Sequence, residues 1–369
     1  MQPEVLLPET DRPRRQALIV ILATFLASRT LLILIAALVE FSLPTANLRS
    51  TFSATPILAS FTGSDSVFLL GIASGGYHAE PIHDLYLDWA FFPLFPIVTR
   101  LASLVVTGNI ALAGVLVSNA AALGAAWLMY RLGEPKFGHT TALLAVVYLL
   151  IAPGAVAFGM AYTDSLFLLL ALCAFLAARE RRWWLMSLAY GLAAITRLPG
   201  ILLGVPLLVI VWQTRDRNIR SLLPLVSGPI ALAGFTIYLW LKFGVWLAYL
   251  RAQVAWTDQT KTVVGGGLPS GAEPLVAILI AILLVYVFLL VYVRRDRMDV
   301  PSIAVMVVAI LTVLVSGRLL SVGRYLAVAW PFSWVLASRT RWVQILVAAA
   351  SGAVFSLLAI LNFTQALAP

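Results

Sequence analysis

Acidic side chains gather in residues 64–96, a stretch that follows the first long apolar segment of the chain. Asp65 opens an apolar, helix-like run, and Glu80, Asp84 and Asp88 follow it. A carboxylate beside a groove at a membrane surface can act as a general base when its environment tunes it. Asp also suits the start of a helix, so a purely structural role for Asp65 stays open.

Two histidines, His78 and His83, flank these acids. A metal site of His and Asp is conceivable, but no ligand spacing typical of a metal motif supports one. The single cysteine, Cys173, lies in an apolar run, which excludes disulfides within the chain and any cysteine-based metal cluster. We therefore expect no metal ligands.

Three arginines at the ends of apolar runs could hold a phosphate: Arg197 in AAITRLPG, and Arg318 and Arg324, which bracket GRLLSVGR. A guanidinium pairs with phosphate through two parallel hydrogen bonds. We predict that Arg324, with Arg197 and Arg318, contacts the phosphate of a lipid carrier. The alternatives are a snorkelling arginine and an ion pair with an acid such as Asp164.

Other candidate substrate contacts accompany these residues. Tyr162 and Asp164 follow a Pro/Gly-rich turn, although the helix dipole alone would favour Asp164 at a helix start. Aromatic residues of the first loop could stack on a sugar or an isoprenoid, yet aromatic belts also occur without a ligand. The complete set of predicted substrate contacts is Tyr77, Glu80, Asp88, Trp89, Phe92, Tyr162 and Asp164.

The elements that must position these residues are membrane helices. The chain of 369 residues is 62% hydrophobic and 11% charged, whereas soluble domains carry about 25% charged residues. So little charge cannot cover a water-facing surface of this size, so lipid is the expected solvent. The net charge of +9 indicates basic cytoplasmic loops rather than a nucleic-acid partner.

About eleven apolar stretches are candidate membrane spans, and Pro199 interrupts the region between two of them. We therefore predict an all-α fold, a polytopic transmembrane helical bundle forming a single domain over 1–369. The predicted spans are 17–41, 109–130, 139–158, 162–178, 182–197, 199–213, 221–241, 274–293, 300–317, 324–338 and 342–362.

Clusters of arginine and lysine set the predicted orientation. Residues 1–16 are placed in the cytoplasm, ahead of a first helix interpreted as a signal anchor, and every later dense basic cluster then falls on the same side. This holds only if 89–107, which contains Pro93, Pro96 and Arg100, is an interfacial or re-entrant helix. Two large loops, 43–108 and 242–273, then lie outside the cytoplasm.

These segments together resemble the PIG-V type mannosyltransferases, especially their shorter bacterial relatives, within the GT-C superfamily of multi-span glycosyltransferases. Where that family has Trp-Asp in the first loop, this chain has Ser64-Asp65. The matching positions are Asp65, Ile72-Ala73, Gly76-Tyr77, Glu80, AFFPLFP (90–96), AYTDSLF (161–167), AITRLPG (194–200) and GRYLAVAWP (323–331).

The resemblance implies a polyprenyl-phosphate-linked mannose donor, a glycolipid or glycan acceptor, and inverting transfer with Asp65 as base. It also implies that no metal is obligatory, and the short chain suggests a bacterial plasma-membrane enzyme. One rival hypothesis is a transporter or flippase, for which ionisable residues should line a path within the bilayer. Arg29, inside the first helix, is one such residue, expected to pair with an acid or backbone carbonyls. A scaffold that has lost activity is another.

Overall fold

The computed structural model describes residues 11–42, 52–53, 55–79, 88–214, 218–254, 273–292, 298–316 and 321–364. Within these ranges the chain forms α-helices and short 3-10 helices and no strand. The predicted all-α fold is confirmed for this part of the chain.

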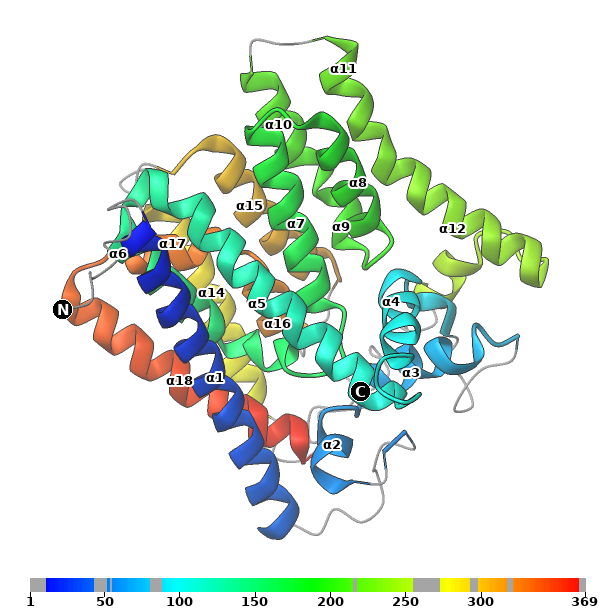
Figure 1. Ribbon diagram of the computed structural model, residues 1–369, viewed down its shortest axis with the longest axis horizontal. Coiled ribbons are helices and arrows are strands. Elements are labelled where there is room, and N and C mark those ends of the chain that lie inside the picture. The colour runs from blue at the N-terminus through cyan, green and yellow to red at the C-terminus, as the bar shows by residue number, and fades with distance from the viewer. Residues whose placement is uncertain are drawn as a thin grey trace, which may run out of the picture.

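The N-terminal half contains both long and short helices. Within it, α5 packs against α4 and against α7 (Figure 1). Its elements are α1 (Asp11–Ser42), α2 (Pro56–Ser60), α3 (Asp65–Gly75), η2 (Asp88–Ala90), α4 (Leu94–Ser103), α5 (Ile110–Phe137), α6 (His139–Leu150), η3 (Pro153–Phe158), α7 (Asp164–Arg179) and α8 (Trp183–Ala194).

The C-terminal half adds helices to both sides of this group: α12 packs against α8, and α18 packs against α1 and η3. Its elements are α9 (Pro199–Leu202), α10 (Gly204–Gln213), α11 (Ile219–Leu222), η4 (Leu223–Val226), α12 (Ser227–Phe243), α14 (Glu273–Tyr292), α15 (Val300–Ser316), α16 (Val322–Ala327), α17 (Pro331–Ala337) and α18 (Arg341–Phe363).

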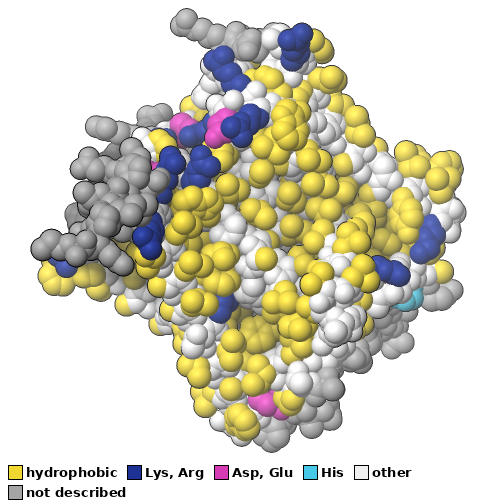
Figure 2. Space-filling model, viewed as in Figure 1, with side chains coloured by type: hydrophobic (Ala, Val, Ile, Leu, Met, Phe, Trp, Pro, Cys, Tyr) yellow, Lys and Arg dark blue, Asp and Glu magenta, His cyan; other side chains and the backbone are white. Residues whose placement is uncertain are grey.

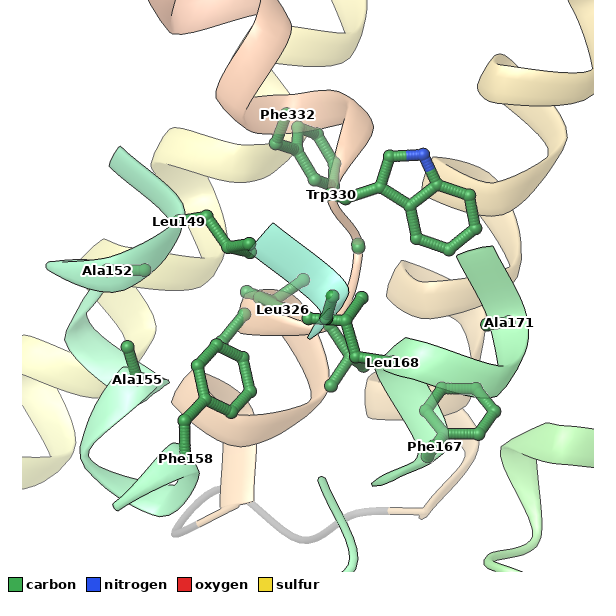
Figure 3. Close-up of a cluster of buried hydrophobic side chains, with 14 of the residues drawn as sticks. Leu149, Ala152, Ala155, Phe158, Phe167, Leu168, Ala171, Leu326, Trp330 and Phe332 are labelled. Carbon is green, nitrogen blue, oxygen red and sulfur yellow. The ribbon is translucent and has the colours of Figure 1, made fainter. Parts of the chain in front are cut away.

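Helix α7 lies at the centre of the bundle, in contact with α5, α8, α10 and η3. Its inward positions include Ala171, Ala174 and Ala178, each fully buried. Small residues let membrane helices approach closely. In Figure 3, Leu326 of α16 lies between Phe158 of η3 and Leu168 of α7, within one apolar cluster. The core therefore joins α7, η3 and α16, the elements that carry the candidate site.

The chain is an integral membrane protein. Four helical stretches within the described residues are long and apolar enough to cross a bilayer, namely 14–42, 110–137, 219–243 and 341–363. Figure 2 shows that hydrophobic side chains cover most of the visible face, with basic side chains mainly toward its margins. Apart from α14, which has 20 residues, the other apolar helices are 10–17 residues long, so the count of eleven crossings stays a prediction.

Two predicted segments take a different form from a continuous spanning helix. The span 324–338 is divided into α16 and α17, because the chain turns before Pro331, which occupies the first turn of α17. Residues 89–107 contain η2 and the ten-residue helix α4, preceded by Pro93. Ten residues rise only about 15 Å, half the thickness of the hydrocarbon core. The proposed interfacial placement of this segment stays a prediction.

Basic side chains from separate helices meet at one end of α7. Asp299, just before α15, accepts a hydrogen bond from Arg179 at the C-terminal end of α7, and Lys136 Nζ of α5 lies 3.2 Å from Asp299 Oδ1. Asp164 begins α7, so it lies at the opposite end of a 16-residue helix, about 24 Å away. Two of the basic clusters assigned to the cytoplasm therefore do converge, away from Asp164.

This arrangement predicts opposite labelling of the two ends of the bundle. In a Cys173→Ser background, Ser74→Cys, at an exposed position of α3, should react with a membrane-impermeant maleimide in intact cells. Glu180→Cys, one residue after α7, should react only after the membrane is opened. Parallel labelling with a permeant maleimide controls for expression and accessibility. Labelling of Glu180→Cys in intact cells would reverse the assigned orientation.

Candidate active site

A fully buried carboxylate, Asp164, joins two arginines from distant parts of the chain. Arg197, just after α8, donates to Asp164 Oδ1 through Nη1. Arg324 of α16 donates to Asp164 Oδ2 through Nε at 3.2 Å and Nη2 at 2.9 Å. Because an isolated buried charge is strongly unfavourable, the three groups depend on one another for their ionised states.

Arg324 also contacts Asp65, the acid that begins α3. Its Nη1 donates to Asp65 Oδ2 at 2.5 Å, so one guanidinium links two carboxylates that are distant in sequence. The side chains of Arg324 and Asp65 are 20% and 22% exposed, whereas that of Asp164 is inaccessible. The structure therefore brings Asp65 and Arg324 together, as the sequence predicted, and leaves both open to a molecule outside the bundle.

Aromatic rings support both guanidinium groups. The Arg324 guanidinium lies 4.3 Å from the centre of the Tyr162 ring, which is itself buried. The Arg197 guanidinium lies 5.0 Å from the Tyr325 ring and 5.8 Å from the Phe167 ring. Cation–π contacts stabilise a partly desolvated cation without neutralising it. The arginines thus keep a positive charge available toward the accessible side of the cluster.

Two glycines allow η3 to lie directly against the start of α16. A Cβ on Gly154 would meet Gly323 O at 1.9 Å and Arg324 N at 2.6 Å. Backbone atoms cannot move aside as a flexible side chain can, so position 154 requires glycine. This contact fixes the backbone of Arg324 relative to η3, and through η3 relative to Tyr162 and Asp164.

Helix α3 is held by apolar packing and begins at an unusual backbone conformation. Leu69 and Leu70 pack with Leu94 and Phe95 of α4 in one buried cluster. Ser64, directly before Asp65, has φ of 55°, a left-handed value that costs a non-glycine residue about 1–3 kcal/mol. The Asp65 carboxylate is therefore aimed by a packed helix and a constrained turn.

The aromatic residues of the first loop are buried rather than displayed. Tyr77, Trp89 and Phe92 are each less than 8% exposed, and they pack with residues of α12. The Tyr77 hydroxyl donates to Phe91 O at 2.7 Å, and the Trp89 ring stacks on Phe243 at 4.8 Å. Packing against α12 covers these rings, and their predicted contact with a substrate stays a prediction.

Asp88 is similarly occupied by protein contacts. Its Oδ2 accepts hydrogen bonds from His78 N at 3.1 Å and from His78 Nδ1 at 2.9 Å. Burial raises the pKa of Asp88, and the hydrogen bonds from His78 oppose that shift. The carboxylate therefore links residues 78 and 88; the residue is 1% exposed, and its predicted contact with substrate stays a prediction.

The remaining predicted residues fall into two groups. Tyr162 and Asp164 are buried and contact the arginines of the site, and their predicted contact with substrate stays a prediction. The pairing of Arg197 with Asp164 is the alternative that the sequence left open. Arg318 and Glu80 lie outside the described residues.

Several residues of the site were not identified from sequence. Tyr325 contacts Arg197, and Ser118 of α5 donates to Tyr162 O at 3.0 Å. Gly154 lies in the segment APGAVAFG and Gly323 in GRYLAVAWP, so both segments can be recognised in the sequence. Their contact was not, because nothing in either motif indicates the other as its partner.

The described residues contain no group of three or more His, Cys, Asp or Glu side chains arranged to hold a metal ion. The carboxylates of the site instead face arginines. These residues place a partly exposed carboxylate, Asp65, beside the Arg324 cation, an arrangement that suits proton removal next to a bound anion.

Comparisons with known proteins indicate the same general class of chemistry. Residues 92–240 match the profile of the dolichyl-phosphate-mannose-protein mannosyltransferase family. That stretch, less than half of the chain, contains Asp164 and Arg197 but neither Asp65 nor Arg324. The profile match supports a membrane glycosyltransferase, while the PIG-V type itself is not established. No curated protein matches the sequence.

Solved structures with similar folds are distant in sequence. An Archaeoglobus fulgidus oligosaccharyltransferase is 15% identical, with a TM-score of 0.47, over 91% of this chain and 53% of that one. ArnT from Cupriavidus metallidurans, solved with undecaprenyl phosphate, is 18% identical, with a TM-score of 0.47, over 92% and 76%. This chain thus spans about half the length of the archaeal enzyme.

The contact between η3 and α16 gives a direct test of how the site is positioned. Gly154→Ala should displace the Arg324 backbone and lower transferase activity at least tenfold. Gly352→Ala in α18, where a Cβ meets nothing within 4 Å, is the matched control and should leave activity unchanged. Equal activity in both variants would show that the close approach does not fix Arg324.

Proposed function

We propose that this protein is a membrane glycosyltransferase that moves mannose from a polyprenyl-phosphate-linked donor to a glycolipid or glycan acceptor on the non-cytoplasmic side of a bacterial plasma membrane. This proposal rests mainly on the contact between the Asp65 and Arg324 side chains, which are both partly exposed. A base and a phosphate-binding cation at one site are the two groups that a single displacement at a sugar phosphate requires, once the phosphate has taken the place of Asp65 on Arg324.

The proposed step uses Asp65 and Arg324 on opposite sides of the reacting carbon. The acceptor hydroxyl loses its proton to the Asp65 carboxylate as its oxygen bonds to the anomeric carbon. The bond from that carbon to the phosphate oxygen breaks, and the lipid phosphate leaves with the electron pair. Arg324 stabilises the charge that develops on the leaving phosphate. A single displacement inverts the anomeric configuration.

Asp164 has a positioning role in this scheme. It takes the Nε and Nη2 donors of Arg324 and the Nη1 donor of Arg197, which leaves the Arg324 Nη1 edge directed at Asp65. An arginine held on one edge loses little freedom when its other edge binds phosphate. The substrate phosphate then competes with Asp65 alone, and its binding frees the Asp65 carboxylate.

A lipid-linked donor also fits the surroundings of Arg197. An apolar pocket lies between α7, α9, α10, α15 and α16, and Phe167, Leu203, Val308, Tyr325 and Trp330 are among the residues that line it. Phe167 and Tyr325 contact the Arg197 guanidinium as well. A molecule with a phosphate and a hydrocarbon chain would find a cation and an apolar surface next to each other.

The alternative hypothesis, that the protein is a transporter, predicts a different experimental result. It predicts accumulation of a labelled substrate in proteoliposomes and no new glycosidic bond. The family profile, which includes Asp164 and Arg197, favours transfer over transport.

Asp65 and Asp164 should differ sharply when each is replaced by asparagine. Asp65→Asn should lower transfer from radiolabelled polyprenyl-phosphate-mannose at least a thousandfold, with little change in the melting temperature. Asp164→Asn removes the buried charge shared by Arg197 and Arg324, which costs about 3–5 kcal/mol, so it should lower both activity and the melting temperature. Glu180→Gln, at an exposed ion pair, is the control.

Full activity of Asp65→Asn would end the assignment of Asp65 as base. Counterflow uptake without a transfer product would favour the transporter.

We also propose that transfer needs no metal ion, because two arginines supply the positive charge at the leaving phosphate. Extensive dialysis against EDTA should leave the transfer rate unchanged within error, and added magnesium or manganese should not raise it. A loss of rate that a divalent cation restores would contradict this proposal.

A further inference from the structure

A second arginine-centred feature lies away from Asp164, on the inward face of α1. Arg29 is 9% exposed, and its Nε, Nη1 and Nη2 atoms are all buried without a hydrogen-bond partner in the part of the chain that the structure describes. The expected pairing of Arg29 with an acid or with backbone carbonyls is therefore wrong. Snorkelling is excluded as well, because the nitrogens themselves are buried.

The guanidinium is surrounded by small and apolar groups. Its carbon is 4.8 Å from the centre of the Phe25 ring, and a Cβ on Gly159 would lie 3.4 Å from Nη1. Asn119 of α5 reaches the same glycine, donating to Gly159 O at 3.2 Å, while its own Oδ1 is buried and unpaired. Unsatisfied donors and an unsatisfied acceptor therefore meet around Gly159.

A buried cation without a counter-charge is among the least favourable arrangements in a protein. Buried polar groups are almost always satisfied, and each exception calls for an explanation such as a missing ligand. The Phe25 ring attracts the cation but accepts no conventional hydrogen bond. An anion is the partner that would satisfy all three nitrogens together.

We propose that Arg29 is the centre of an oxyanion-binding site that takes a phosphate group. The planar fork of a guanidinium matches two oxygens of one phosphate, which a spherical halide cannot supply. A phosphate monoester that keeps one proton also offers a hydroxyl to Asn119 Oδ1. This combination favours phosphate over a carboxylate.

The site is separate from the cluster at Asp164, and its existence does not rest on the proposed function. Helix η3 lies between them: Gly154, near its start, contacts the backbone of Arg324, and Gly159, just after its end, faces Arg29. Five residues of 3-10 helix rise about 10 Å, so Arg29 and the Arg324 backbone contact opposite ends of η3.

Equilibrium binding to the purified full-length protein in an uncharged detergent tests this site. Radiolabelled dodecyl phosphate represents a lipid phosphate, and radiolabelled inorganic phosphate represents the free anion. Arg29→Met should bind one equivalent fewer than the wild type. Arg15→Met, an exposed arginine on the same helix, should bind as many as the wild type. Arg29→Met and the wild type should differ by one equivalent whether or not Arg324 binds phosphate. A failure of the proposed function can therefore be distinguished from a failure of this proposal.

Loss of the equivalent for dodecyl phosphate alone would identify a lipid headgroup site, and loss for both probes a site for phosphate in general. Equal stoichiometry in Arg29→Met and the wild type would overturn the proposal. Arg29→Lys, which keeps the charge but not the fork, should retain the equivalent with about tenfold weaker affinity; unchanged affinity would contradict the forked contact.

Thermal unfolding without ligand gives an independent check. Arg29→Met removes an unpaired buried charge, so it should melt at a higher temperature than the wild type. A lower melting temperature, or failure to fold, would show that Arg29 is already satisfied and would overturn the proposal.

Discussion

The buried carboxylate of Asp164 is the constraint on which the site depends. It pairs with two arginines in an apolar bundle, and it does so without contact with water. Its place at the start of α7 adds the favourable field of the helix N-terminus. Because Arg197 and Arg324 come from different helices, their shared partner ties α7, α8 and α16 together at one end of the bundle.

The same constraint gives the two aspartates of the site different roles. Asp164 is enclosed and satisfied on both oxygens, so it positions its partners. Asp65 shares only one edge of Arg324 and is partly exposed, so it can exchange partners when a phosphate arrives. Arg29 shows the opposite case, a buried cation with no such partner. In both places the chemistry follows from how each guanidinium is satisfied.

Burial also decides which aromatic residues are available. Tyr162, Tyr325 and Phe167 flank the arginines, whereas Tyr77 and Trp89 are enclosed against α12. Polar atoms of the enclosed loop are used internally, as Asp88 and His78 show. The first loop therefore serves as a packed support beside the site, and Asp65 is the part of it that reaches Arg324.

Sequence alone determined the membrane class and the positions of most helices. It also identified Asp65 as a candidate base and Arg324 as a candidate phosphate ligand. Apolar length and charge depletion suffice for the first two, because lipid imposes them on every spanning helix. Motif likeness supplied the third. Only the tertiary structure decided that Asp164 lies beneath both arginines, that Gly154 meets Gly323, and that Arg29 lacks a hydrogen-bond partner among the described residues. These depend on contacts between segments far apart in the chain, and no local pattern of residues encodes which segments will touch.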